Sequence, residues 1–147
     1  HLRAEIFALV YSNIDSLYKK GERNFIVMGD MNDNPWDETI EESFKTKVYS
    51  QNPQPILTNL MQGNKDITGS YVYGGSYLSF DQFLVSDNVK KHIIYNETFN
   101  KSHIYNPKFL IDPNPKNKLI TPFSTYRGIK YQGGISDHFP IIMMINE

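Results

Sequence analysis

The chain has 147 residues, and its 15 lysines and arginines nearly balance 16 aspartates and glutamates, which gives a formal net charge of -1. This length favours one domain with its own core, and the balanced charge gives no support for a general polyanion-binding surface. The chain has no cysteine, which excludes disulfides, thiol catalysis and cysteine-bound zinc. No apolar run is long enough to span a bilayer and no signal peptide is recognisable, so the compartment stays unknown.

The first segment predicts a helix over Leu2–Lys20. Apolar residues recur there at intervals of three and four, at Leu2, Ile6, Leu9, Val10, Ile14 and Leu17. Gly21 follows directly and is a typical helix stop. The short apolar run Phe25–Met28 predicts a buried strand, and a helix joined to a strand by a short turn indicates layered α/β packing.

The predicted strand runs into Gly29–Trp36, whose Gly, Asn and Pro residues indicate a loop. Asp30 and Asn32 are separated by one residue, so in an extended stretch both side chains leave one face and can orient a water and hold a phosphoryl oxygen. The alternative is that both are turn formers that bond local backbone. A short helix capped by Asp37 is expected next, followed by a surface loop over 50–69 around a short apolar piece.

Two further strands are predicted over Gly69–Tyr73 and Ser79–Ser86, joined as a hairpin through a glycine pair. By alternation, Asp81 shares a face of the second strand with Phe83 and Val85. A carboxylate on a buried face needs a partner, because unpaired burial is costly. A surface position at the start of the strand is the alternative for Asp81.

Residues Asp112–Lys118 and Thr121–Gly134 are rich in Pro, Asn, Gly and Ser and predict exposed loops. Arg127 lies in the second of these loops, between Tyr126 and Tyr131. Arg127 and the tyrosines are candidates to contact a phosphate or to stack on a base. They are equally able to pack the loop, so Arg127 is a candidate substrate-binding residue with a structural alternative.

The segment Ser136–Pro140 stands between a glycine pair and the apolar run Ile141–Ile145, which predicts a buried strand. Asp137 and His138 are therefore expected at the entrance of a strand, where a rigid element aims them. Adjacent carboxylate and imidazole groups can hold a cation and act as acid or base. Polar residues that merely cap the strand are the alternative.

Three motifs, each beside a predicted strand, follow in order: Gly29–Asn32 with Pro35, Ser79–Ser86, and Ser136–Pro140. This ordered set resembles the C-terminal half of the endonuclease/exonuclease/phosphatase superfamily, which has the DNase I-like fold. Phe123–Gly128 also resembles a branch of that superfamily common in bacteria. The resemblance implies an α/β (α+β) chain that forms part of a four-layer α/β/β/α sandwich with mostly antiparallel or mixed sheets.

The resemblance also implies residue roles in a phosphate-ester hydrolase that uses Mg²⁺ or Mn²⁺. Asp30 would orient or deprotonate the attacking water, and Asn32 would bind a phosphoryl oxygen. Asp137 would be a metal ligand, and His138 would donate to the scissile phosphate. Asp81 would bond the far nitrogen of His138 and keep it protonated and oriented.

By the same resemblance, residues 1–147 are expected to be the C-terminal portion of one such domain. The N-terminal half, which supplies an Asn and a Glu to the metal site in the family, has no match here and is an expected partner. Half a sandwich leaves apolar surface uncovered, which favours a homo-oligomer.

The expected activity is that of a phosphodiesterase or endonuclease. The alternatives are a non-catalytic binding module on the same fold and a phosphomonoesterase acting on a lipid or sugar phosphate, besides an unrelated α/β domain. The sequence leaves the substrate open among nucleic acid, nucleotide, lipid and sugar phosphates.

Overall fold

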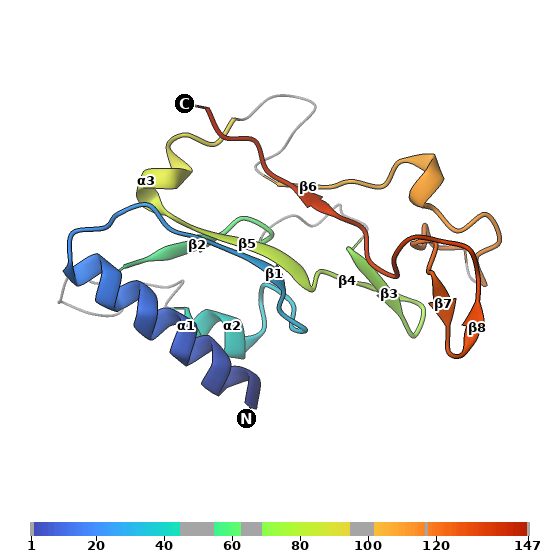
Figure 1. Ribbon diagram of the computed structural model, residues 1–147, viewed down its shortest axis with the longest axis horizontal. Coiled ribbons are helices and arrows are strands. Elements are labelled where there is room, and N and C mark those ends of the chain that lie inside the picture. The colour runs from blue at the N-terminus through green and yellow to red at the C-terminus, as the bar shows by residue number, and fades with distance from the viewer. Residues whose placement is uncertain (1, 45–54, 63–68, 95–101, 117, 147) are drawn as a thin grey trace.

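The computed structural model describes residues 2–44, 55–62, 69–94, 102–116 and 118–146 (Figure 1). The predicted surface loop over 50–69 falls partly outside them, and in the described part it is wrong, because a buried strand lies at Leu57–Asn59. Helices accompany several small antiparallel sheets, so the predicted α/β (α+β) class is confirmed. The largest sheet has the strand order β1-β5-β2, in which the strands are β1 (Ile26–Asp30), β5 (Asp81–Ser86) and β2 (Leu57–Asn59). The four-layer arrangement stays a prediction.

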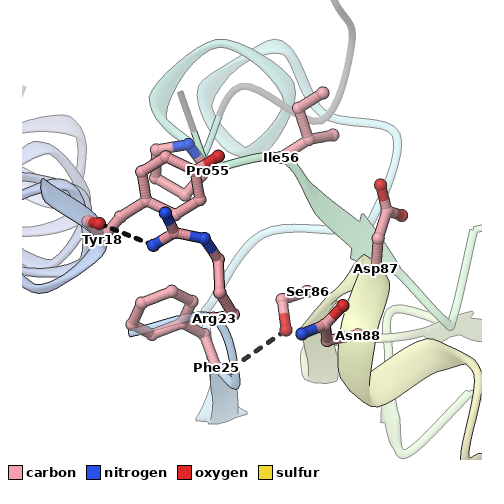
Figure 2. Close-up of a pocket in the computed structure, with 8 residues that line it drawn as sticks. All are labelled: Tyr18, Arg23, Phe25, Pro55, Ile56, Ser86, Asp87 and Asn88. Atoms are coloured by element: carbon pink, nitrogen blue, oxygen red, sulfur yellow. Dashed lines mark hydrogen bonds between the residues drawn. The ribbon is translucent and has the colours of Figure 1, made fainter. Parts of the chain in front are cut away.

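The first helix, α1 (Leu2–Lys19), ends where the sequence predicts. Gly21 has a φ of 105° and its N–H donates to the Tyr18 carbonyl, a left-handed ending that favours glycine. Arg23 donates to the same carbonyl and its guanidinium lies 4.0 Å from the centre of the Tyr18 ring (Figure 2). These contacts fix the turn between α1 and β1.

The predicted apolar face of α1 is partly wrong. The buried residues are Phe7 and Ile14, with Val10, Tyr11 and Tyr18 partly buried. The predicted positions Leu2, Ile6, Leu9 and Leu17 are exposed. The buried face of α1 is therefore rotated from the predicted one. The prediction used only aliphatic residues, whereas Phe7, Tyr11 and Tyr18 also pack against the sheet and α2.

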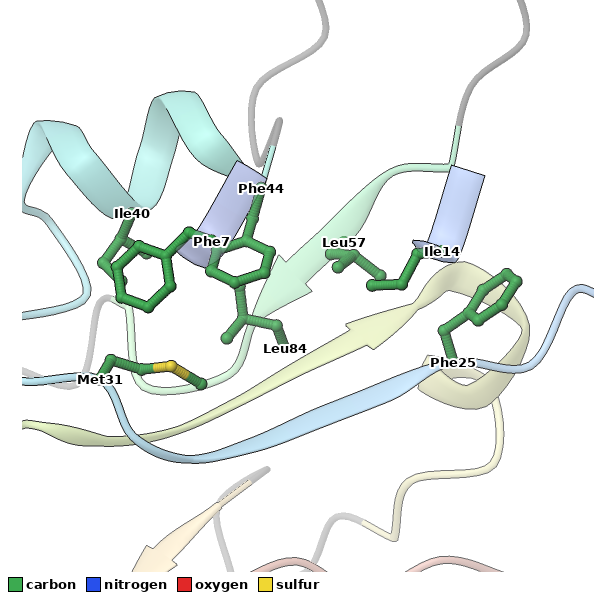
Figure 3. Close-up of a cluster of buried hydrophobic side chains, with 8 residues drawn as sticks. All are labelled: Phe7, Ile14, Phe25, Met31, Ile40, Phe44, Leu57 and Leu84. Atoms are coloured by element: carbon green, nitrogen blue, oxygen red, sulfur yellow. The ribbon is translucent and has the colours of Figure 1, made fainter. Parts of the chain in front are cut away.

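Helices α1 and α2 (Glu38–Ser43) cover one face of the largest sheet (Figure 1). Between them lies a core of large side chains, drawn in Figure 3. Its members are Phe7, Ile14, Phe25, Met31, Ile40, Phe44, Leu57 and Leu84. The rings of Phe7 and Phe44 lie 5.2 Å apart and join the two helices directly. Burial of this core holds the helices to the sheet.

The second face of the sheet packs against the C-terminal segment. Phe83 and Val85 of β5 lie there with Leu60, Val89 and Ile93, against Ile141 and Met143. The predicted strand over Ile141–Ile145 is shorter than expected, because only β9 (Ile141–Ile142) pairs in a ladder, with β6 (His103–Ile104). An isolated bridge at Ile145 continues the direction. The remaining short helices are α3 (Asp87–Lys90) and the 3-10 turn η1 (Lys108–Leu110).

The predicted hairpin partner is wrong. The glycine pair does join two strands, but these are β3 (Tyr71–Tyr73) and β4 (Ser76–Leu78). Ser79–Ser86 instead supplies β5, which pairs with β1 and β2. A second short hairpin consists of β7 (Tyr126–Arg127) and β8 (Lys130–Tyr131). The local turn signal assigned Ser79–Ser86 to the hairpin, but this segment pairs with strands that are distant in the sequence.

The prediction of a buried strand over Phe25–Met28 is partly wrong, because β1 is an outer strand of its sheet and two of its apolar side chains remain uncovered. Ile26 is 44% exposed and Met28 is 70% exposed. An open strand edge with exposed apolar side chains is a site for pairing with another strand.

None of the described helices is long and apolar enough to cross a membrane.

Replacing Phe44 by alanine should destabilise the chain by about 3 kcal/mol, because the side chain is completely buried and its removal leaves a cavity between the helices. Chemical denaturation followed by circular dichroism measures the change. Phe109→Ala is the matched control, since that ring is 64% exposed and should cost little. Equal losses in the two variants would contradict the packing described.

The exposed edge of β1 predicts self-association of the chain. Sedimentation velocity should show heavier species that increase with concentration, and Met28→Lys should shift the distribution toward monomer, because a charge on an open edge opposes strand pairing. Tyr73→Lys is the control, since Tyr73 and Met28 are equally exposed at 70%. A stable monomer of the unmodified chain at high concentration contradicts this prediction.

Candidate active site

Asp81 and His138 form the centre of the candidate site. The Nδ1 atom of His138 lies 2.6 Å from the Oδ2 atom of Asp81. Both side chains are largely buried, at 22% exposed for His138 and 19% for Asp81. The contact holds Nδ1, so Nε2 remains for a substrate atom. The structure thus brings together two residues that are 57 positions apart in the chain.

The pair favours its charged form. The hydrogen bond to Asp81 raises the pKa of His138, burial lowers it, and the charges of Asp81, Asp30 and Asp137 raise it again, so the net shift is upward. Burial raises the pKa of Asp81, but hydrogen bonds with the side chains of His138 and Ser70 and the charge of His138 outweigh burial and leave it lowered. An imidazolium next to a carboxylate is the state expected of a phosphate donor.

Ser70 and Tyr71 position the pair, and the sequence did not single them out for this task. Ser70 is fully buried; its Oγ accepts the Asp81 N–H at 3.2 Å, and its carbonyl accepts the Phe139 N–H at 2.8 Å. The Tyr71 ring stacks on the His138 ring with 4.6 Å between centroids. The sequence placed Ser70 inside the predicted strand over Gly69–Tyr73 and gave no signal of its bond to Asp81.

Asp30 lies at the end of β1, directly opposite Asp81 of β5 in the ladder. The predicted loop therefore starts later than expected, because Gly29 and Asp30 belong to the strand. The Met31 N–H donates to the Phe80 carbonyl, so these two residues form a hydrogen-bonded pair of the ladder. Hydrogen-bonded and non-hydrogen-bonded pairs alternate in an antiparallel ladder, so the next pair, Asp30–Asp81, is non-hydrogen-bonded, with Cα atoms about 4.5 Å apart. Two carboxylates at such a position repel each other, and a protonated His138 offsets this repulsion.

Asn32 is not extended, which was the condition for its side chain and that of Asp30 to leave one face of the chain. Its φ is 53°, in the left-handed region that asparagine tolerates, and its N–H donates to Asp30 Oδ1 at 2.8 Å. This is the turn-forming alternative considered for the two residues. The Asn32 amide still faces the Asp30 carboxylate, with Nδ2 3.5 Å from Oδ2. Asp30 and Asn32 are both exposed, so solvent and substrate can reach them.

The loop after β1 is anchored by buried polar groups that the sequence did not reveal. Gln82 is fully buried, accepts a bond from Asn59 Nδ2 at 2.6 Å and donates to the carbonyls of Asp33 and Ser79. Arg3 of α1 donates to the Asn32 carbonyl and pairs with Asp33 at 3.0 Å. A polar residue at a core-facing position of β5 was the signal available. These bonds hold the loop against the strand that carries Asp81.

Asp137 is exposed and adjoins His138. The described segments hold no group of three or more histidines and carboxylates placed to bind a metal ion. Mg²⁺ in proteins is often held by one or two carboxylates together with water and substrate phosphate oxygens. Asp137 and Asp30 therefore fit part of such a site as hard oxygen donors, and the described residues do not supply a complete set of ligands.

Arg127 is already paired. Its Nη2 lies 2.8 Å from Asp112 Oδ2, and the Asp112 side chain is only 7% exposed. This contact agrees with the structural alternative for Arg127, because one side of its guanidinium holds the loop at Asp112, and the role of Arg127 as a substrate contact stays a prediction. Arg127 nevertheless lines a hollow together with Tyr71 and Asp137. It stays near the centre of the site.

Another hollow, of about 210 Å³, lies at the far end of the sheet (Figure 2). It is lined by Tyr18, Arg23 and Phe25 on one side and Ser86 and Asp87 on the other. Phe25 precedes β1 and Asp30 ends it, so this hollow and the Asp81–His138 pair stand at opposite ends of the strand. The hollow belongs to the turn after α1 and not to the candidate site.

Comparison with known protein families matches residues 3–147 of the chain to the Endonuclease/Exonuclease/phosphatase family. The chain therefore belongs to this family, as its ordered motifs predicted. Its class is that of the phosphoesterase and nuclease-type hydrolases. No curated protein and no solved structure matches the chain.

The Asp81–His138 contact predicts an elevated pKa for the His138 ring that depends on Asp81. NMR titration of the histidine rings without divalent ions should give His138 a midpoint above the ordinary histidine value. In Asp81→Asn the midpoint should fall, because the hydrogen bond to the Asp81 carboxylate and its charge no longer raise the pKa, while burial still lowers it. Exposed His92 serves as the internal control. An unchanged His138 midpoint in Asp81→Asn would contradict the pairing.

Proposed function

We propose that the chain hydrolyses a phosphate ester, as a phosphodiesterase or nuclease, at the site centred on His138. The observation that carries this proposal is the contact between His138 Nδ1 and Asp81 Oδ2 at 2.6 Å, which leaves Nε2 to donate to a phosphoryl oxygen. Family membership supports the reaction class. A phosphate ester needs cationic donors on its oxygens and a placed nucleophile, and the site offers candidates for both.

In the proposed reaction, a water oxygen attacks phosphorus while the bond between phosphorus and the leaving oxygen breaks, and the leaving oxygen keeps the electron pair of that bond and takes a proton from solvent water. Asp30 orients the water and takes its proton, since its carboxylate is exposed and held by Asn32. Asn32 donates its side-chain amide to a phosphoryl oxygen. His138 donates Nε2–H to another phosphoryl oxygen, and Asp81 keeps the ring charged and oriented.

We further propose that Asp137 contributes a hard oxygen ligand to Mg²⁺ or Mn²⁺, with Asp30 as the second available carboxylate. The ion, when bound, would neutralise charge on the phosphate. Its other ligands would come from water, from the substrate and from the N-terminal half expected for a complete family domain. This chain's own residues still bind the phosphoryl oxygens and position the water.

Hydrolysis of bis(p-nitrophenyl) phosphate with Mg²⁺, with Mn²⁺ and with a chelator tests the proposal. We expect metal-dependent turnover and a loss of roughly 100-fold or more in kcat for His138→Ala, because a donor to the transition state is removed. His92→Ala is the matched control, since His92 is exposed and outside the site. Equal turnover in the two variants would contradict the role of His138.

A further inference from the structure

A cleft of about 340 Å³ lies beside the candidate site, between the two β-hairpins. The β3–β4 hairpin contributes Tyr71 to its wall, and the β7–β8 hairpin contributes Tyr126 and Arg127. Both hairpins stand at the same end of the molecule (Figure 1). The proposed reaction uses only the edge of this cleft, so most of its lining has no assigned task.

The cleft opens onto the reacting centre. Asp137 lies in its wall and is the residue directly before His138. Tyr71 lines the cleft and also stacks on the His138 ring at 4.6 Å. A group bound in the cleft therefore lies beside Tyr71 and Asp137 and next to the segment that carries His138.

Positive charge lines the cleft away from Asp137. Lys116 is exposed and lies in the wall, and it forms no ion pair within the described part of the chain. Arg127 binds Asp112 through Nη2, and a guanidinium has further N–H donors in its fork. Among the described residues that line the cleft, only Asp137 is acidic. The wall beyond Asp137 therefore favours an anion.

Tyrosine rings offer a complementary surface for an uncharged part of a ligand. Tyr126, which is 60% exposed, lies on one side of the cleft, and Tyr71, whose ring stacks on His138, lies on the other. An aromatic face accepts a sugar or a base, and the phenol hydroxyl adds a polar contact. The cleft thus combines aromatic walls with cations, which suits an organic group that carries a phosphate.

We propose that the cleft binds a second phosphate group of the substrate and that Lys116 is its main recognition residue. This inference rests on the proposed function and narrows it to substrates that carry two phosphates joined by a sugar or alcohol. The second phosphate is either the next one in a nucleotide chain or a second one on a sugar. The two sources share the same chemistry and differ in what lies between the phosphates.

Calorimetric titration with Mg²⁺ present tests the inference through binding alone. Thymidine 3′,5′-bisphosphate is compared with thymidine 5′-phosphate, and glucose 1,6-bisphosphate with glucose 1-phosphate. The unmodified chain should bind the bisphosphate of at least one pair about fivefold more tightly, the factor expected of one exposed charged contact. The pair that shows this preference identifies the source of the second phosphate.

Lys116→Ala should abolish the preference for the bisphosphate. Lys118→Ala is the matched control, because it removes the same charge from the same loop at a position that does not line the cleft. Equal affinities within both ligand pairs for the unmodified chain, or the same loss in both variants, would overturn the inference. His138-dependent hydrolysis is measured separately, so a failure of the proposed reaction is distinguished from a failure of the second phosphate site.

Discussion

In the ladder between β1 and β5, each residue of β1 has one fixed partner, and the last pair places Asp30 opposite Asp81. The side chains along β5 alternate between the two faces, so a slip of one residue would move Asp81 to the helix-covered core and bring Gln82 to the site. The register is held by the core on both faces of β5, where Phe83 and Leu84 are buried. Packing of the sheet thereby fixes the spacing of the acidic groups around His138.

A single serine connects this ladder to the C-terminal motif. The Ser70 hydroxyl binds the backbone of Asp81, and the Ser70 carbonyl binds the backbone of Phe139, next to His138. Phe139 is itself almost completely buried, at 1% exposed, against Met61 and Ile104. The imidazole is therefore held through its own backbone as well as through Asp81. Because the hairpin that follows Ser70 also lines the cleft, the proposed phosphate-binding cleft and the Asp81–His138 pair depend on the same short segment.

Much of this arrangement could be predicted from the sequence because its signals are local. Gly21 marked the end of α1, and alternation placed Asp81 on one face with Phe83 and Val85, where both apolar residues are buried. The order of three short motifs indicated the family that the comparison confirms. A glycine pair indicated a hairpin, and the turn is present between β3 and β4.

The errors arise where distant contacts decide. β5 pairs with β1 and β2 and not with the strand beside it, because only a central position buries both of its faces. The ion pair between Arg127 and a carboxylate 15 residues away likewise could not be predicted from the sequence, which left a loop contact and a substrate contact open for Arg127. Asn32 adopts a left-handed turn in which its N–H donates to the Asp30 carboxylate. The spacing of the two residues alone could not distinguish this turn from an extended conformation. Roles of the site residues and of a metal ion remain predictions.

The most direct test of the central claim, that His138 donates to a phosphate, is an NMR titration of the ¹⁵N-labelled histidine rings with inorganic phosphate and Mg²⁺. The structure predicts a saturable shift of the His138 Nε2 signal, because Nδ1 is held by Asp81 and Nε2 is left for the ligand. His92 and His103 lie elsewhere in the chain and report non-specific binding. A His138 signal that does not move, or that moves no more than those of His92 and His103, would contradict the claim.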